Sequence, residues 1–126
     1  MSDSIKHECG IALLRLLKPL QYYQEKYGSL FFGIYKMYLM LEKQHNRGQD
    51  GAGFASIKFD MSPGDSFMSR VRSSENQPIQ DIFSTINSDL NEVFQELGKN
   101  NLTELEIKQA YPYLGELMMG HLRYGT

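Results

Sequence analysis

An amphipathic pattern over residues 79–97 constrains the fold of this chain most strongly. Its apolar side chains recur at the spacing of one helix face: Ile79, Ile82, Phe83, Ile86, Leu90, Val93, Phe94 and Leu97. Gln77 and Pro78 precede this stripe, and proline is tolerated in the first turn of a helix. Gly98 follows as a stop signal. We therefore predict one long helix over residues 79–97.

Four segments have the composition or the alternation of β-strands. Residues 9–17 form a nearly continuous apolar run, which predicts a buried strand. Residues 54–59 alternate apolar and polar side chains, and a turn signal at 62–65 separates them from a second strand at 67–72. This pair predicts a hairpin. Residues 117–124 predict a last strand.

The remaining segments predict helices and a loop. Residues 34–44 carry apolar side chains at helical spacing, and Gly48 follows shortly as a stop signal. Residues 100–110 are polar and predict a short, exposed helix, whereas residues 18–33 predict a loop with room for a helical turn. Because helices and strands alternate without a regular βαβ spacing, the pattern favours a layered α+β domain over a doubly wound fold.

The composition excludes several classes of protein. The chain has 126 residues, which suits one domain or part of one. Seven Phe and eight Tyr are too many for a disordered chain. The net charge of −2 indicates neither a nucleic-acid nor a membrane partner, and no stretch approaches the ~18 apolar residues of a membrane span. Met1 to Glu8 lack the apolar core of a secretory signal, so we expect a cytoplasmic protein.

Three clusters carry the residues that could do chemistry: His7 to Ala12, Gln44 to Gly53 and Gly120 to Thr126. Taken singly, they are typical of a buried cysteine, glycines in tight turns and a solvated strand face. The single cysteine excludes an internal disulfide. The histidines and Cys9 lack the spacing of a metal site, and the glycines lack that of a phosphate-binding loop, so we predict neither.

Together and in this order, the clusters resemble the class II glutamine amidotransferases, a family of N-terminal-nucleophile hydrolases. The resemblance rests on Cys-Gly-Ile from Cys9, Arg-Gly-Gln-Asp from Arg47 and Gly-His-Leu-Arg-Tyr-Gly-Thr from Gly120. It spans residues 9–126, with residues 73–115 matched least. Within the family, the second and third motifs look most like the glutaminase domain of amidophosphoribosyltransferases.

This resemblance implies a four-layer αββα fold, of which the chain holds the N-terminal part. Residues 1–8 would be a leader that is removed, and residues 9–126 the front of the glutaminase domain. The rest of that domain and a phosphoribosyltransferase domain would lie outside the chain, so we expect these residues alone to be inactive.

The implied complete enzyme hydrolyses glutamine to glutamate and ammonia. The ammonia would then pass to phosphoribosyl pyrophosphate in the first step of purine synthesis. No cofactor is expected in this segment, because Mg²⁺ would be bound by the phosphoribosyltransferase domain. The full-length protein is expected to form a homo-oligomer.

The resemblance makes Cys9 the nucleophile. Once the bond between Glu8 and Cys9 is cleaved, the α-amine of Cys9 lies beside its own thiol. An α-amine has a pKa of ~7.7–8.0, so it can take the thiol proton and return it to the leaving ammonia. While Glu8 is attached, this nitrogen is an amide and cannot act as a base. A His7–Cys9 dyad is the alternative, because residues two apart in extended chain share a face.

The resemblance implies a substrate-binding role for the third cluster. The Arg123 guanidinium would bind the α-carboxylate of glutamine through two parallel hydrogen bonds. Tyr124 and Thr126 match positions that contact the same end of the substrate. His121 shares the strand face of Arg123 and would support it.

The second cluster would pack beside the nucleophile. Its supporting residues are Arg47, Gly48 and Asp50, with Arg47 ordering the backbone near Cys9. A surface ion pair between Arg47 and Asp50 is the alternative explanation.

The chain departs from the family in three respects. Asn46 stands between His45 and Arg47, where most relatives have no residue. Residues 79–97 and the polar segment after them look like an insertion. The family's oxyanion-hole Asn-Gly motif and the Asp that binds the substrate amine are not in this chain.

The sequence is compatible with two other functions. One is the glutaminase of another class II amidotransferase, such as a hexosamine-phosphate synthase or an asparagine synthetase. The other is a noncatalytic interaction module that uses the helix over residues 79–97 as a docking surface.

Overall fold

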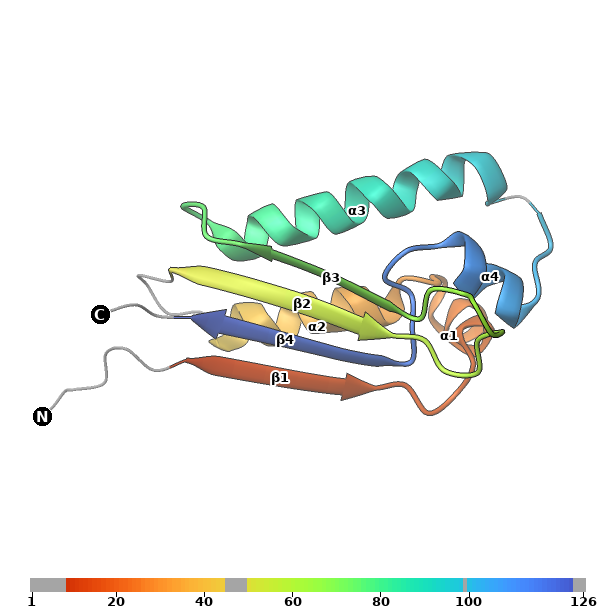
Figure 1. The fold of residues 1–126 in the computed structure, drawn as a ribbon, viewed down its shortest axis with the longest axis horizontal. Helices are drawn as coiled ribbons and strands as arrows, with labels where there is room; N and C mark the ends of the chain where they lie inside the picture. Colours follow the sequence, from red (N-terminus) through yellow and green to blue (C-terminus); the bar gives the residue numbers. More distant parts are fainter. Residues whose placement is uncertain (1–8, 45–49, 99, 124–126) are drawn as a thin grey trace, which may run out of the picture.

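A four-stranded antiparallel sheet forms one layer of the molecule, and two helices cover one of its faces (Figure 1). The computed structural model describes residues 9–44, 50–98 and 100–123. Their elements are, in chain order, β1 (Gly10–Arg15), α1 (Leu20–Tyr27), α2 (Phe32–Gln44), β2 (Gly51–Ile57), β3 (Met68–Ser73), α3 (Pro78–Leu97), α4 (Glu104–Ala110) and β4 (Leu117–Arg123). The predicted α+β class is confirmed.

The strands follow the order β1-β4-β2-β3, so the last strand of the chain lies inside the sheet. β4 pairs with β1 on one side, where Gly10 is opposite Leu122. It pairs with β2 on the other side, where Gly51 is opposite Arg123. The hairpin of β2 and β3 then completes the sheet. Segments from the two ends of the chain are thereby hydrogen-bonded to each other.

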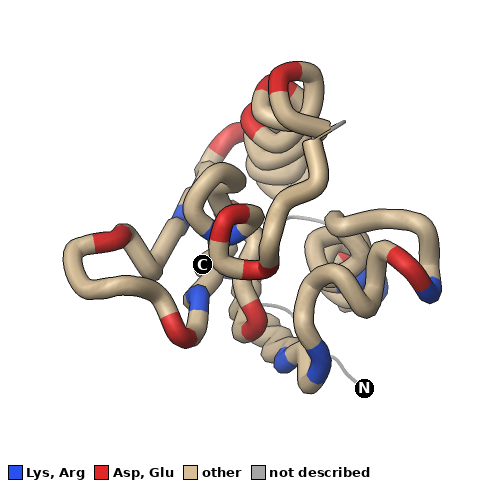
Figure 2. Tube along the Cα trace, turned by 90° about the vertical axis from the view of Figure 1, so that its right-hand side faces the viewer, with Lys and Arg blue, Asp and Glu red and all other residues tan. Residues whose placement is uncertain are grey.

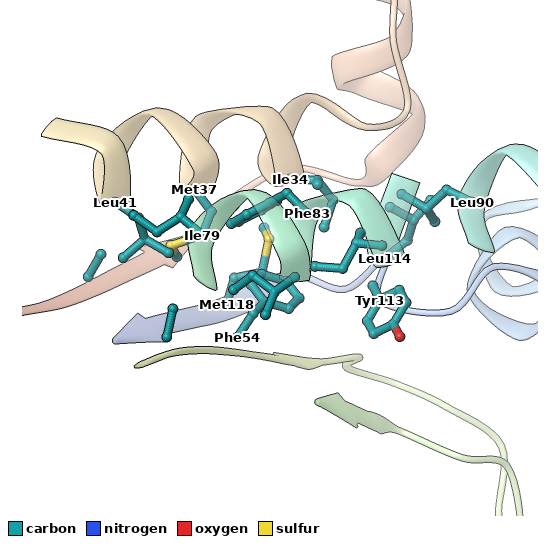
Figure 3. Close-up of a cluster of buried hydrophobic side chains, with 14 of the residues drawn as sticks. Ile34, Met37, Leu41, Phe54, Ile79, Phe83, Leu90, Tyr113, Leu114 and Met118 are labelled. Carbon is teal, nitrogen blue, oxygen red and sulfur yellow. The ribbon is translucent and has the colours of Figure 1, made fainter. Parts of the chain in front are cut away.

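The core lies between the sheet and helices α2 and α3 (Figure 3). α2 contacts β1 and β4, whereas α3 contacts β2 and β3. In β4, Met118, Gly120 and Leu122 are buried, while the residues between them face away from the helices. A Cβ at Gly120 would lie 2.8 Å from Cδ1 of Leu41, so glycine lets α2 approach the sheet closely.

The other face of the sheet is open in the described residues. Ile11 and Leu13 of β1 are 67% and 63% exposed, and Met119 of β4 is 44% exposed. The prediction of a buried strand over residues 9–17 is therefore wrong for half of its side chains. A continuous apolar run suits a strand covered on both faces, but α2 covers β1 on one face only.

Most local predictions are confirmed, with shifted ends. The long helix, the helix near residues 34–44, the hairpin and the last strand all form. Residues 18–33 contain the eight-residue helix α1, which is more than the predicted turn. The short helix α4 forms, but it is not fully exposed, because Ile107 and Lys108 are buried. Gly48 and Tyr124 lie outside the described residues.

Buried charges join α4 to one end of the sheet. Lys108 Nζ lies 2.7 Å from Glu116 Oε2 and donates to the Phe59 carbonyl at 2.6 Å. Lys58 Nζ donates to the carbonyl oxygens of Lys108 and Tyr111. Burial, with the nearby Lys108 charge, lowers the pKa of Lys58 below its ordinary value. We call Lys58, Lys108 and Glu116 the lysine network.

Candidate functional site

The three sequence clusters converge at the end of the sheet away from the lysine network. Gly10 pairs with Leu122, and Gly51 pairs with Arg123. Cys9 directly precedes Gly10. The start of β1, the end of β4 and the start of β2 therefore lie side by side (Figure 1). We call this part of the molecule the motif end.

Cys9 and Arg123 lie at neighbouring strand ends, because Cys9 directly precedes β1 and Arg123 is the last residue of β4. Because Gly10 pairs with Leu122, continuing the antiparallel register by one residue sets Cys9 opposite Arg123. Arg123 is exposed and alternates with the buried Leu122, which places its side chain on the open face. Cys9 is also exposed, and by the same alternation it shares this face with Ile11. A thiol and a guanidinium thus occupy the same side of the sheet.

Asp50 ties the second cluster to the third. Its backbone N–H donates to the Arg123 carbonyl oxygen at 2.8 Å. Gly51 follows, and a Cβ there would lie 3.2 Å from the Ser73 carbonyl oxygen and 3.9 Å from Arg123 Cβ. Glycine at this position therefore accommodates the close approach of the β3 backbone at Ser73. Within the described residues no carboxylate forms an ion pair with the Arg123 guanidinium.

Gln44 is a residue of this site that the sequence predictions missed. Its side-chain Nε2 donates to the Ile11 carbonyl oxygen at 3.0 Å. Its Oε1 lies so close to Gly10 that a Cβ at that position would clash. Gln44 therefore fastens the end of α2 to β1 beside Cys9. Its place at the end of a predicted helix and at the start of the second cluster was the available signal.

His121 lies on the open face of the sheet, with its ring over β2. It is exposed, shares the face of Arg123 as predicted, and pairs with Gly53 of β2. A Cβ at Gly53 would clash with Nε2 of the imidazole, so the ring occupies the space above this glycine. Gly51 and Gly53 thus lie in a strand, rather than forming the tight turn that is typical of such glycines, and Gly53 gives room to the His121 ring of β4.

Several predicted site residues lie outside the described part of the chain. They are the leader at residues 1–8, Arg47, Gly48, Tyr124 and Thr126. Their roles stay predictions, as does the His7–Cys9 dyad. The described residues that flank residues 45–49 are Gln44 and Asp50, and these contact β1 and β4 respectively.

No protein-family model, curated protein or solved structure matches this chain. In the described ranges, no group of three His, Cys, Asp or Glu side chains is placed to hold a metal ion. None of the helices in those ranges combines the length and apolar character needed to span a bilayer.

Proposed function

We propose that the chain is the front part of a glutaminase of the class II amidotransferase type, with Cys9 as its nucleophile. One observation carries this proposal. The register of β1, β4 and β2 gathers the Cys-Gly-Ile, Asp50 and Arg123 parts of three separate motifs at one end of one sheet. Motif order along a chain does not by itself require such a gathering.

The geometry suits free glutamine as the substrate. Glutamine carries a carboxylate and an amide at opposite ends of a short chain. The Arg123 guanidinium would bind the carboxylate through two hydrogen bonds, and Cys9, just before the neighbouring strand β1, would meet the amide carbon.

The proposed chemistry uses one residue as both nucleophile and base. The Cys9 α-amine takes the thiol proton, and the sulfur forms a bond to the amide carbon. As the carbon–nitrogen bond of the amide breaks, the protonated α-amine of Cys9 gives this proton to the leaving nitrogen, which departs as ammonia. A water molecule then hydrolyses the thioester to glutamate and the free thiol. The exposure of Cys9 leaves its sulfur accessible to substrate.

The open face supports the finer prediction of an αββα fold. Helices cover one face of the sheet, and the exposed Ile11 and Leu13 of β1 give the other face an apolar half. We propose that a second sheet packs on this half, because two sheets bury such faces against each other at a spacing of ~10 Å. The helix layer and the sheet would then be two of the four layers.

The identity of the ammonia acceptor rests on the motif resemblance alone. Arg-Gly-Gln-Asp and His-x-Arg-Tyr favour an amidophosphoribosyltransferase, with phosphoribosyl pyrophosphate and Mg²⁺ bound by a domain beyond these 126 residues. A hexosamine-phosphate synthase or an asparagine synthetase is the runner-up.

The interaction-module alternative loses its main support. Ile79, Ile82, Phe83, Ile86 and Leu90 of α3 are buried in the core, so the apolar stripe already has a partner. The exposed large side chain of this stripe is Phe94, which is 46% exposed.

Binding of glutamine to a chain that begins at Cys9 tests the proposal. Addition of L-glutamine should shift the backbone amide resonances of Gly10, Gly51 and Leu122 saturably, while those near the lysine network stay constant. D-Glutamine is the matched control and should cause much smaller shifts. Equal shifts with both enantiomers, or none at the motif end, would overturn the proposal.

A further inference from the structure

A second candidate site lies on the open face, in a groove along β2. Its volume is about 320 Å³. The side chains that shape it come from three strands: Gly53 and Ala55 of β2, Arg70 and Arg72 of β3, and Met119 and His121 of β4. The motif-end residues Cys9 and Arg123 do not line it.

The strand register explains the shape of this groove. Arg72 and His121 both pair with Gly53, on opposite sides of β2. Arg70 and Met119 both pair with Ala55 in the same way. Because glycine has no side chain and alanine only a methyl group, long side chains on both sides rise above a shallow floor.

The groove has positive charge and no acidic counterpart. Arg70 and Arg72 share one face of β3, ~7 Å apart along the strand. Neither forms an ion pair or a hydrogen bond through its guanidinium with the described residues. The four strands contain no Asp or Glu, and the acidic residues of the described chain lie on helices and connecting segments (Figure 2). Two like charges on one strand therefore line a groove without a neutralising carboxylate.

We propose that Arg70, Arg72 and His121 bind an oxyanion, the carboxylate or phosphate of a small ligand. Guanidinium groups donate two parallel hydrogen bonds to either anion, and an imidazole N–H across the groove supplies another donor. The volume is at the lower end of the range of small-molecule sites.

The position of the groove keeps it reachable. The apolar residues Ile11 and Leu13 lie on β1, whereas Arg70 and Arg72 lie on the edge strand β3. A layer packed on the β1 half leaves the β3 edge open. The inference goes beyond the proposed glutaminase, because it requires neither a free Cys9 nor Arg123.

Titration of the 126-residue chain with inorganic phosphate, and separately with glutarate, tests the proposal. We expect saturable shifts of the Gly53 and Ala55 amides and of the Arg70 and Arg72 Nε–H resonances. Preference for phosphate or for glutarate then identifies the anion. Arg72→Gln should weaken binding by about tenfold, because it removes a charge-assisted fork. Arg70→Gln provides an independent second variant.

Arg15→Gln is the matched control, since Arg15 is an exposed arginine of the same sheet on β1, outside the groove. It should leave anion binding unchanged. An equal loss in Arg15→Gln, or no saturable shift with either anion, would overturn the proposal. L-Glutamine binding at the motif end is measured separately, so failure of one site is distinguishable from failure of the other.

Discussion

The two ends of the sheet hold their polar residues in opposite ways. At the lysine network, Lys108 and Glu116 have side chains only 4% and 12% exposed and are hydrogen-bonded to each other and to the backbone. At the motif end, Cys9 and Arg123 are exposed, and strand pairing rather than side-chain contact brings them together. Satisfied buried charges hold a fold together, whereas exposed groups that the backbone has positioned remain free to bind a ligand.

The largest expected effect is at the lysine network. Lys108→Met leaves the largely buried Glu116 carboxylate, 12% exposed, without its cation, so the free energy of unfolding should fall by about 3–5 kcal/mol. Urea denaturation measures it. Lys36→Met, at an exposed position of α2, is the control and should change stability by less than about 0.5 kcal/mol. A loss at Lys108 as small as that of the control would remove the contrast between the two ends.

At the motif end, a substitution should change the affinity for glutamine rather than the free energy of unfolding. Arg123→Lys keeps the charge but removes the fork, so glutamine affinity should drop about tenfold to a hundredfold. Calorimetric titration of a chain that begins at Cys9 measures this. Arg15→Lys makes the same change on β1 and should bind glutamine normally. Unchanged affinity in Arg123→Lys would take this arginine out of the site.

A smaller, pH-dependent effect is expected beside the lysine network. Burial raises the pKa of Tyr111 above its ordinary value of 10.0. The phenol ionises first in the unfolded chain, so its contribution to stability is complete below pH 10 and is lost as the pH rises toward the folded-state pKa. The unfolding free energy of Tyr111→Phe should therefore fall less than that of the parent chain above pH 10. Parallel curves for both proteins would contradict the assignment.

The smallest expected effect is on the stability of the motif end. Cys9→Ala removes an exposed thiol, so the free energy of unfolding should change by less than about 0.5 kcal/mol. The same urea experiment checks it. A loss of several kcal/mol would mean that Cys9 is a packing residue, which is the explanation that a single cysteine most often has.

Local patterns predicted the elements of this fold, but not how they pair. The stripe of α3 and the alternation of β2 can each be read from consecutive residues, because helix and strand have different periods. The pairing of β1 with β4 joins segments that are far apart in the sequence, so a pattern of consecutive residues cannot predict it. Only the motif resemblance indicated that Cys9 and Arg123 would meet.

The burial of charge was the least predictable feature. Lys58 and Lys108 are of a residue type that usually lies at the protein surface, because lysine is rarely buried unless it is paired. Their partners include three main-chain carbonyl oxygens. Every residue carries such an oxygen, so the residue types in the sequence do not show which ones will accept these hydrogen bonds. Arg70 and Arg72 alternate in a predicted strand, so the sequence places them on one face. That Arg72 lies opposite Gly53, which leaves space for a groove, is known only from the strand register.

Reaction with a glutamine-like electrophile tests whether Cys9 is the nucleophile. Diazo-oxo-norleucine would be added to the full-length protein that begins at Cys9 and to the same protein that retains residues 1–8, and the adduct located by peptide mass spectrometry. We expect labelling of Cys9 in the first protein, protection of Cys9 by L-glutamine, and almost no labelling in the second, where the Cys9 nitrogen is an amide. Equal labelling of both proteins, or none in the protein with a free Cys9 amine, would contradict this role of Cys9.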